Sequence, residues 1–244
     1  ALQAETRSTE ITKGTSRLDL AFQPVIDGVH LPRSPLEAVR DGSANDVPLL
    51  IGTNEDEWNL FALMMQGELD EAKAIRRLDR VRPGEGDELF KVYAADRPDA
   101  SPTDTYNAIL SDLVFRIPAI RLAEAHRHAA ASGVDTRMYF FTHASTAFDG
   151  KLGSCHALEI PFVFDTVGRA GVDFFLGHEP PAGLAPAMND AWAAFARTGD
   201  PSTDALPDWP VYDEDTRVTM ELGDECRLLT DPLPAERLWW DGRL

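Results

Sequence analysis

A short uncharged run at residues 47–51 (VPLLI) is the feature that most restricts the fold of this chain of 244 residues. The run passes directly into Gly-Thr-Asn at residues 52–54, which is a typical turn sequence. A core helix would need a longer apolar stretch, whereas a strand buried on both faces needs only about five residues. Such strands occur in parallel sheets that are covered by helices. We therefore expect a buried strand here.

Helical spacing dominates residues 105–117. One face of this segment collects apolar side chains, namely Tyr106, Ile109, Leu110, Leu113 and Ile117. Pro118 follows, and a proline inside a helix removes a backbone donor and collides with the preceding turn. A second helical stretch resumes after it and ends near Gly133. The sequence thus predicts a kink or a break at Pro118.

The rest of the chain continues to alternate between strand and helix patterns. Residues 136–143 (TRMYFFTH) are rich in aromatic side chains and predict a second buried strand. Residues 186–201 space their apolar side chains at helical intervals before a Gly-Asp-Pro stop. Residues 217–231 read as two strands joined by Gly-Asp, a hairpin signal. The fold class is therefore α/β, in one domain or part of one.

The predicted strands do not complete a sheet. A sheet made only of these apolar strands would leave hydrophobic edges open, which natural proteins avoid. The composition, with 43% hydrophobic and 26% charged residues, is that of an ordinary folded protein. The missing neighbours are therefore expected in a segment that precedes Ala1.

The net charge of −18 restricts the partners of the chain. A surface that binds phosphate backbones or anionic lipid needs clustered Lys and Arg, so neither nucleic acid nor a membrane is an expected partner. No apolar run approaches the roughly 20 residues that span a bilayer. The two cysteines, Cys155 and Cys226, match no zinc-ligand pattern. They favour a reducing, cytoplasmic setting over secretion, with a single disulfide between them as the alternative.

Three consecutive acids, Glu55, Asp56 and Glu57, directly follow the first predicted strand. Ligands of open α/β sheets bind beyond the carboxyl ends of the strands, so a functional carboxylate fits this position. The alternative is a solvated acidic loop on an already acidic protein. Spacing alone favours that alternative.

His156 lies in the segment GSCHALEI, where small neighbours would let a ligand or a reacting group approach closely. A structural histidine is the alternative, and a metal site formed with Glu159 lacks a third ligand. His126 and His128 lie on a predicted helix and are expected at the surface. His143 ends a predicted strand and fits either a buried or an exposed position.

A carboxylate after a strand, followed later by a histidine, matches two members of a nucleophile–acid–histidine triad in the order used by α/β-hydrolases. The nucleophile should come first, on a GxSxG elbow, and the sequence contains neither that motif nor an HGGG-type loop. Ser16 lacks the second glycine of the elbow. Ser154 follows the acid and adjoins His156, which is the wrong order.

Three long segments resemble the type-B carboxylesterase family, which includes para-nitrobenzyl esterases and cholinesterases. They are FQPVIDGVHLPRSPLEAVRDGSANDVPLLIGTNEDEWNLF, GSCHALEIPFVFD and MNDAWAAFARTGDPSTDALPDWPVYDEDTRVTMELG. The segments follow the family's order and extend from residue 22 to residue 240. The resemblance implies an α/β-hydrolase fold with a mostly parallel sheet flanked by helices. Family members are longer, so residues 1–244 would be the C-terminal half of a single hydrolase domain.

The resemblance also implies roles for individual residues. By position, Glu57 corresponds to the family's triad glutamate and His156 to its triad histidine. Members often have glycine where this chain has Trp58, a difference that is expected to reshape the nearby pocket. Glu159 would then be a structural neighbour of the site.

Four apolar residues resemble positions that line the acyl or alcohol pocket in the family. They are Leu60, Phe61, Met64 and Phe115. Packing in the hydrophobic core is the alternative for each of them.

The activity implied by the resemblance is the hydrolysis of carboxylic esters through an acyl-enzyme, with no cofactor and no metal. The serine and the glycine-rich oxyanion loop would lie in the preceding half of the esterase. That half would be the partner of this chain, alongside a small ester substrate, and this chain alone is expected to be inactive. The alternative is a catalytically silent member that serves as a binding or adhesion module, because some members have lost triad residues.

Overall fold

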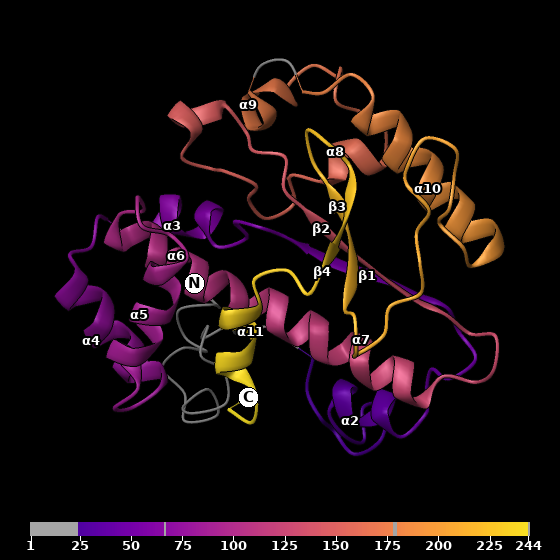
Figure 1. Ribbon diagram of the computed structural model, residues 1–244, viewed down its shortest axis with the longest axis horizontal. Helices are drawn as coiled ribbons and strands as arrows, with labels where there is room; N and C mark the ends of the chain where they lie inside the picture. Colours follow the sequence, from indigo (N-terminus) through magenta and orange to yellow (C-terminus); the bar gives the residue numbers. More distant parts are fainter. Residues whose placement is uncertain (1–23, 66, 178–179, 244) are drawn as a thin grey trace. The chain divides into compact units, whose positions relative to one another are not determined.

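The computed structural model describes residues 24–65, 67–177 and 180–243 (Figure 1), and the chain divides into two compact units, Ala1–Ala38 and Val39–Leu244. In the first unit, the side chain of Asp27 closes a turn by accepting hydrogen bonds from the backbone N–H groups of Leu31, Val29 and His30. These bonds, led by those from Leu31 and Val29, lower the pKa of the Asp27 carboxyl to about 2. The short helix α2 (Pro35–Arg40) follows.

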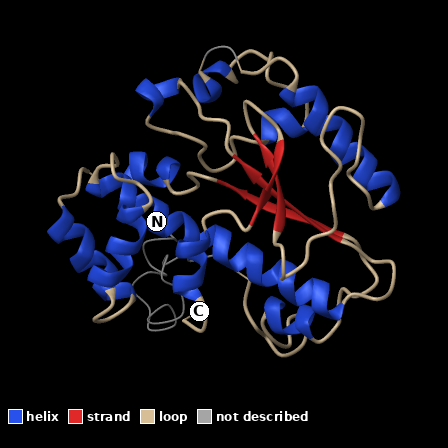
Figure 2. Ribbon diagram, viewed as in Figure 1, coloured by secondary structure: helices blue, strands red, loops and turns tan. Residues whose placement is uncertain are grey.

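The second unit contains a mixed sheet with the strand order β1-β2-β3-β4 (Figure 2). Strands β1 (Leu49–Asn54), β2 (Thr136–Phe141) and β3 (Val218–Leu222) run parallel. Strand β4 (Arg227–Thr230) pairs antiparallel with β3, which confirms the predicted hairpin. Strand β1 begins directly after Pro48, because proline has no N–H to donate to a ladder.

Alternate side chains of the strands enter two separate hydrophobic clusters. Ile51 and Met138 pack into a cluster formed with helices α3 to α7 and α11, whereas Leu50 and Tyr139 pack into a cluster formed with α8 to α10. Helices therefore cover both faces of the sheet, as Figure 1 shows. The residues of β1 up to Gly52 are only half-buried, since among the described residues β1 has one neighbouring strand.

Helices connect the strands in chain order. Between β1 and β2 lie α3 (Asn59–Met65), α4 (Glu71–Val81), α5 (Gly86–Ala95), α6 (Pro102–Ser111), the π-helical turn η2 (Asp112–Arg116) and α7 (Ile117–Ala129). Between β2 and β3 lie the 3₁₀ turn η3 (Ala147–Gly150), α8 (Ile160–Val163), α9 (Asp173–Leu176) and α10 (Leu184–Thr198). Helix α11 (Pro234–Trp240) follows β4. None of the helices in the described ranges is long and apolar enough to cross a membrane.

The expected break at Pro118 is placed differently in the structure. The chain stays helical through Pro118, which occupies the first turn of α7, and the irregularity is the π-helical turn just before it. The backbone N–H of Ile117 donates to the carbonyl of Asp112, five residues earlier. This wider turn moves the preceding carbonyls away from the proline ring, so the helix bulges rather than breaks.

The prediction that His126 lies at the surface is wrong. Its side chain is 2% exposed, because α7 packs against β1 and β2. The ring nitrogens are both bonded, Nδ1 to Thr136 Oγ1 at 2.8 Å and Nε2 to the carbonyl of Val47 at 2.9 Å. A histidine whose two ring nitrogens both form hydrogen bonds can be buried, even on a helix face whose sequence suggests exposure. His128, two residues further on, is exposed as expected.

Candidate active site

The three acids after β1 have three different environments. Glu55 is exposed, Asp56 is half-buried and Glu57 is buried, with 6% of its surface accessible. The backbone N–H of Asn54, the last residue of β1, donates to Glu57 Oε1 at 2.9 Å. The turn after the strand therefore bends back on itself and fixes one carboxylate oxygen. Spacing alone favours a solvated acidic loop for all three residues, and only Glu55 fits that description.

The loop that carries His156 is joined to the acidic turn by backbone bonds. The N–H of Asp56 donates to the carbonyl of Ser154, and the N–H of Ser154 donates to Asp56 Oδ2, both at 2.9 Å. The hydroxyl of Ser154 donates to the carbonyl of Phe141, at the end of β2. Gly153 has a φ of 55°, and a Cβ there would lie 2.2 Å from Asp56 Oδ2. Only glycine therefore allows the two loops to meet this closely.

Glu57 and His156, 99 residues apart in the chain, are joined by a hydrogen bond. The distance from His156 Nδ1 to Glu57 Oε2 is 2.7 Å. Because a carboxylate only accepts, the proton of the neutral ring is assigned to Nδ1, which leaves the lone pair on Nε2. The bond to Glu57 raises the pKa of His156 above its usual value, and burial partly opposes this rise. The His156 side chain is 42% exposed, so the ring is open to a reacting group.

Two phenyl rings support the imidazole of His156. The centroids of Phe61, from α3, and Phe115, from η2, lie 5.2 and 5.1 Å from the imidazole centroid. Trp58 packs against Phe61, with the two ring centroids 5.2 Å apart. These contacts limit the orientations of the His156 ring and leave its accessible surface on the remaining side.

The four predicted pocket residues do not lie together. Phe61 and Phe115 both contact His156. Leu60 packs instead against the hydrophobic cluster formed with α8 to α10, on the other side of the sheet. Met64 lies further along α3, and 67% of its surface is exposed.

Asn54 is a site residue that the sequence did not single out. Its side-chain N–H group donates to the carbonyl of Cys155 at 2.7 Å and to Glu159 Oε2 at 2.6 Å. It thereby ties the end of β1 to both sides of His156. Burial raises the pKa of the Glu159 carboxyl, which the bond from Asn54 opposes. Its position in the turn that follows the apolar run was the available signal, because polar groups at strand ends often serve the site.

A metal site is not formed by these residues. In residues 24–65, 67–177 and 180–243, no group of three or more His, Cys, Asp or Glu side chains could hold a metal ion. His143, the other histidine that follows a strand, is buried and bonded through Nδ1 to Asp224 Oδ1 at 2.7 Å. It joins β2 to the β3–β4 hairpin turn. Cys155 and Cys226 are free thiols.

The chain matches the carboxylesterase family over residues 2–237, and it belongs to that family. The resemblance read from the sequence is thus confirmed, and with it the α/β-hydrolase fold class. Among solved structures, the carboxylesterase EST55 of Geobacillus stearothermophilus superimposes with a TM-score of 0.78 at 34% identity, covering 91% of this chain and 46% of that one.

Curated relatives are esterases and related hydrolases. The para-nitrobenzyl esterase of Bacillus subtilis (strain 168) is 34% identical over 224 residues, which cover 89% of this chain and 42% of that protein. The phenmedipham hydrolase of Pseudarthrobacter oxydans is 32% identical over 210 residues, 84% of this chain and 41% of that protein. The chain thus spans about two fifths of the length of these relatives.

Proposed function

We propose that Glu57 and His156 are the acid and the general base of a Ser-His-Glu triad that hydrolyses carboxylic esters. The serine comes from a polypeptide segment outside this chain, the N-terminal half of the same esterase with its GxSxG elbow. The observation that carries the proposal is the 2.7 Å bond from His156 Nδ1 to the buried Glu57 carboxylate. Membership of the carboxylesterase family supports it.

The geometry suits a general base. His156 Nε2 would take the proton of the serine hydroxyl while the serine oxygen bonds to the ester carbonyl carbon. Glu57 stabilises the imidazolium that forms and keeps the proton on Nδ1. The imidazolium then gives its new proton to the oxygen of the departing alcohol, which leaves an acyl-enzyme. Water, deprotonated by the same nitrogen, releases the acid and restores the serine.

Phe61 and Phe115 are the proposed apolar wall of the substrate site. Both contact the base, so an ester placed for attack would meet their rings. Of the other two residues drawn from the family resemblance, Met64 has an exposed side chain that a substrate could contact, whereas Leu60 anchors α3 in the hydrophobic core. Apolar side chains beside the reacting atoms exclude water and strengthen the Glu57–His156 bond.

The proposal is tested with the complete coding sequence that contains this chain. Hydrolysis of p-nitrophenyl acetate is measured for the parent protein, for the His156→Ala variant and for this chain alone. We expect His156→Ala to lower kcat by about a thousandfold or more, and this chain alone to show only background hydrolysis. A serine-directed phosphonate should label one peptide that carries GxSxG and lies outside this chain.

Two results would contradict the proposal. Hydrolysis that persists in the His156→Ala variant would exclude His156 as the general base. A parent protein with no serine at the elbow, and no hydrolysis, would support the catalytically silent binding module instead.

A further inference from the structure

The π-helical turn η2 interrupts two regular helices at the site. Such turns are rare and often lie at functional positions, because one extra residue in the turn redirects the side chains on either side. Relative to a regular helix, one residue corresponds to a rotation of about 100°. In this chain the side chains of the turn divide between the Glu57–His156 pair and a buried cluster of charges.

Toward the pair, the segment around η2 contacts the residue after the acid and the ring of the base. Ser111, which precedes η2, accepts a hydrogen bond at 2.9 Å on its hydroxyl oxygen from the backbone N–H of Trp58, the residue after Glu57. Phe115, within η2, packs against His156. Two residues of one helical segment, Ser111 and Phe115, thus contact the turn that carries the acid and the ring proposed as the base.

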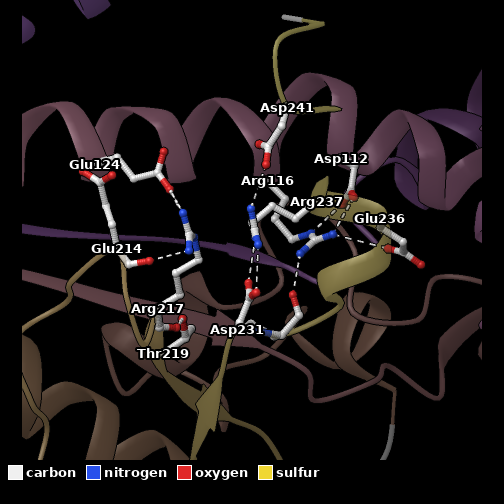
Figure 3. A network of polar contacts seen from close by, with 11 residues as sticks. Asp112, Arg116, Glu124, Glu214, Arg217, Thr219, Asp231, Glu236, Arg237 and Asp241 are labelled. Carbon is white, nitrogen blue, oxygen red and sulfur yellow. Dashed lines mark hydrogen bonds and ion pairs between the residues drawn. The ribbon is translucent and has the colours of Figure 1, made fainter. Parts of the chain in front are cut away.

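Away from the pair, the turn is held by buried charges. Arg116 donates from Nε and Nη2 to the two carboxylate oxygens of Asp112, each at 2.6 Å. Arg116 Nη2 also lies 3.3 Å from Glu236 Oε2, and Tyr93 donates its hydroxyl to Asp112. Figure 3 shows Arg116 between Asp112 and Glu236, all three with less than a tenth of their side chains exposed.

The charges come from distant parts of the chain. Glu236 lies in α11, 120 residues after Arg116, and it also pairs with Arg97, which follows α5. Burying such ions gains little stability over apolar packing, because desolvation offsets their attraction. Their bidentate geometry does restrict the shape of the segment that carries them. We therefore expect this cluster to fix the shape of the helical segment rather than to add to the stability of the fold.

We propose that η2 is a positioning element for the Glu57–His156 pair. The buried cluster of Asp112, Arg116 and Glu236 fixes the wide turn. Ser111, directly before the turn, then holds the backbone next to the acid, and Phe115, within the turn, packs against the base. The consequence for catalysis rests on the function proposed above. The consequence for the hydrogen bond between Glu57 and His156 does not.

The first experiment measures the pKa of His156 in this chain by NMR titration of its ring resonances, assigned with His156→Ala. We expect Ser111→Ala and Glu236→Gln each to lower this pKa by about 0.5, a threefold change in the ionisation constant, because the bond to Glu57 lengthens. Glu124→Gln is the matched control. This change removes the carboxylate of Glu124, which lies on α7 and pairs with Arg217, as Figure 3 also shows. Glu124 contacts neither η2 nor the pair.

The inference is overturned if the pKa of His156 is unchanged in folded Ser111→Ala, which removes one oxygen atom and should fold whatever Glu236→Gln does. It is equally overturned if the Glu124→Gln control shifts the pKa as much, since the effect would then follow stability and not position.

The second experiment separates this inference from the proposed function. In the parent protein, Ser111→Ala should lower kcat for p-nitrophenyl acetate about tenfold and change KM less than twofold, because the substrate contacts persist while the base is misplaced. If His156→Ala leaves hydrolysis intact, the proposed function fails even where the NMR shifts occur. If hydrolysis depends on His156 but not on Ser111, only the positioning role fails.

Discussion

Replacing Gly153 by alanine should disconnect the loop of His156 from the turn of Glu57. The φ of Gly153 is 55°, and the added Cβ would lie 2.2 Å from Asp56 Oδ2, a distance that no carbon and oxygen atoms tolerate. The Asp56 carboxylate must therefore move. It then loses the bond that it accepts from the backbone N–H of Ser154.

The expected loss of stability has three parts. The left-handed conformation costs an alanine about 1–2 kcal/mol. A hydrogen bond to a charged acceptor contributes about 1.5–3 kcal/mol. Alanine also lowers the conformational entropy of the unfolded chain, which stabilises the folded state by about 0.4–1 kcal/mol. The free energy of unfolding should therefore fall by about 2–4 kcal/mol.

Urea unfolding monitored by tryptophan fluorescence measures this loss, and Gly84→Ala is its control. Gly84 has a φ of 79° and open space around its added Cβ, so its replacement costs the backbone strain alone. The difference between the two variants, about 1.5–3 kcal/mol, isolates the bond between Ser154 and Asp56. Equal losses in the two variants would refute the reasoning, because the contact between the loops would then contribute nothing.

Four other expectations follow from the site and its surroundings. Glu57→Gln should lower the pKa of His156 toward its ordinary value in an NMR titration. Because that pKa is raised in the fold, the stability contributed by the wild-type pair is full below pH 6.5 and is lost as the pH rises through the raised value, which urea midpoints across pH will show. Burial raises the pKa of the Cys155 thiol to about 12, so a thiol reagent at pH 8 should label it only at the rate of unfolding. Glu236→Ala removes the buried carboxylate that pairs with the half-buried Arg97 and the buried Arg116, and it should cost about 3–5 kcal/mol in urea unfolding; a loss below 1 kcal/mol would mean that water replaces the carboxylate.

The strands and the long helices were predictable because their signals are local. Residues 47–51 are apolar and residues 136–143 are rich in aromatic side chains, each over the length of a strand. A glycine follows the helix that ends at residue 198, and its φ of 79° fits a helix stop. These patterns depend on neighbours in sequence. The structure confirms each of them with shifts of a few residues at the ends.

The arrangement of the site was predictable only in part. Spacing alone could not separate Glu57 from Glu55, since both are acids at the end of the same strand. The family resemblance made that distinction, and the structure adds the reason, a bond from the backbone of Asn54. The contact of Gly153 with Asp56 and the burial of His126 escaped the sequence analysis, because each depends on residues that meet only after folding.

The bond between Glu57 and His156 is made entirely within one polypeptide. In the proposed triad, the acid and the base are therefore already paired before the serine reaches them. If the segment with the serine were supplied as a separate molecule, recovery of activity would be limited by encounter of the two pieces. Its rate should rise in proportion to their concentrations, with no slower unimolecular phase for rebuilding the base.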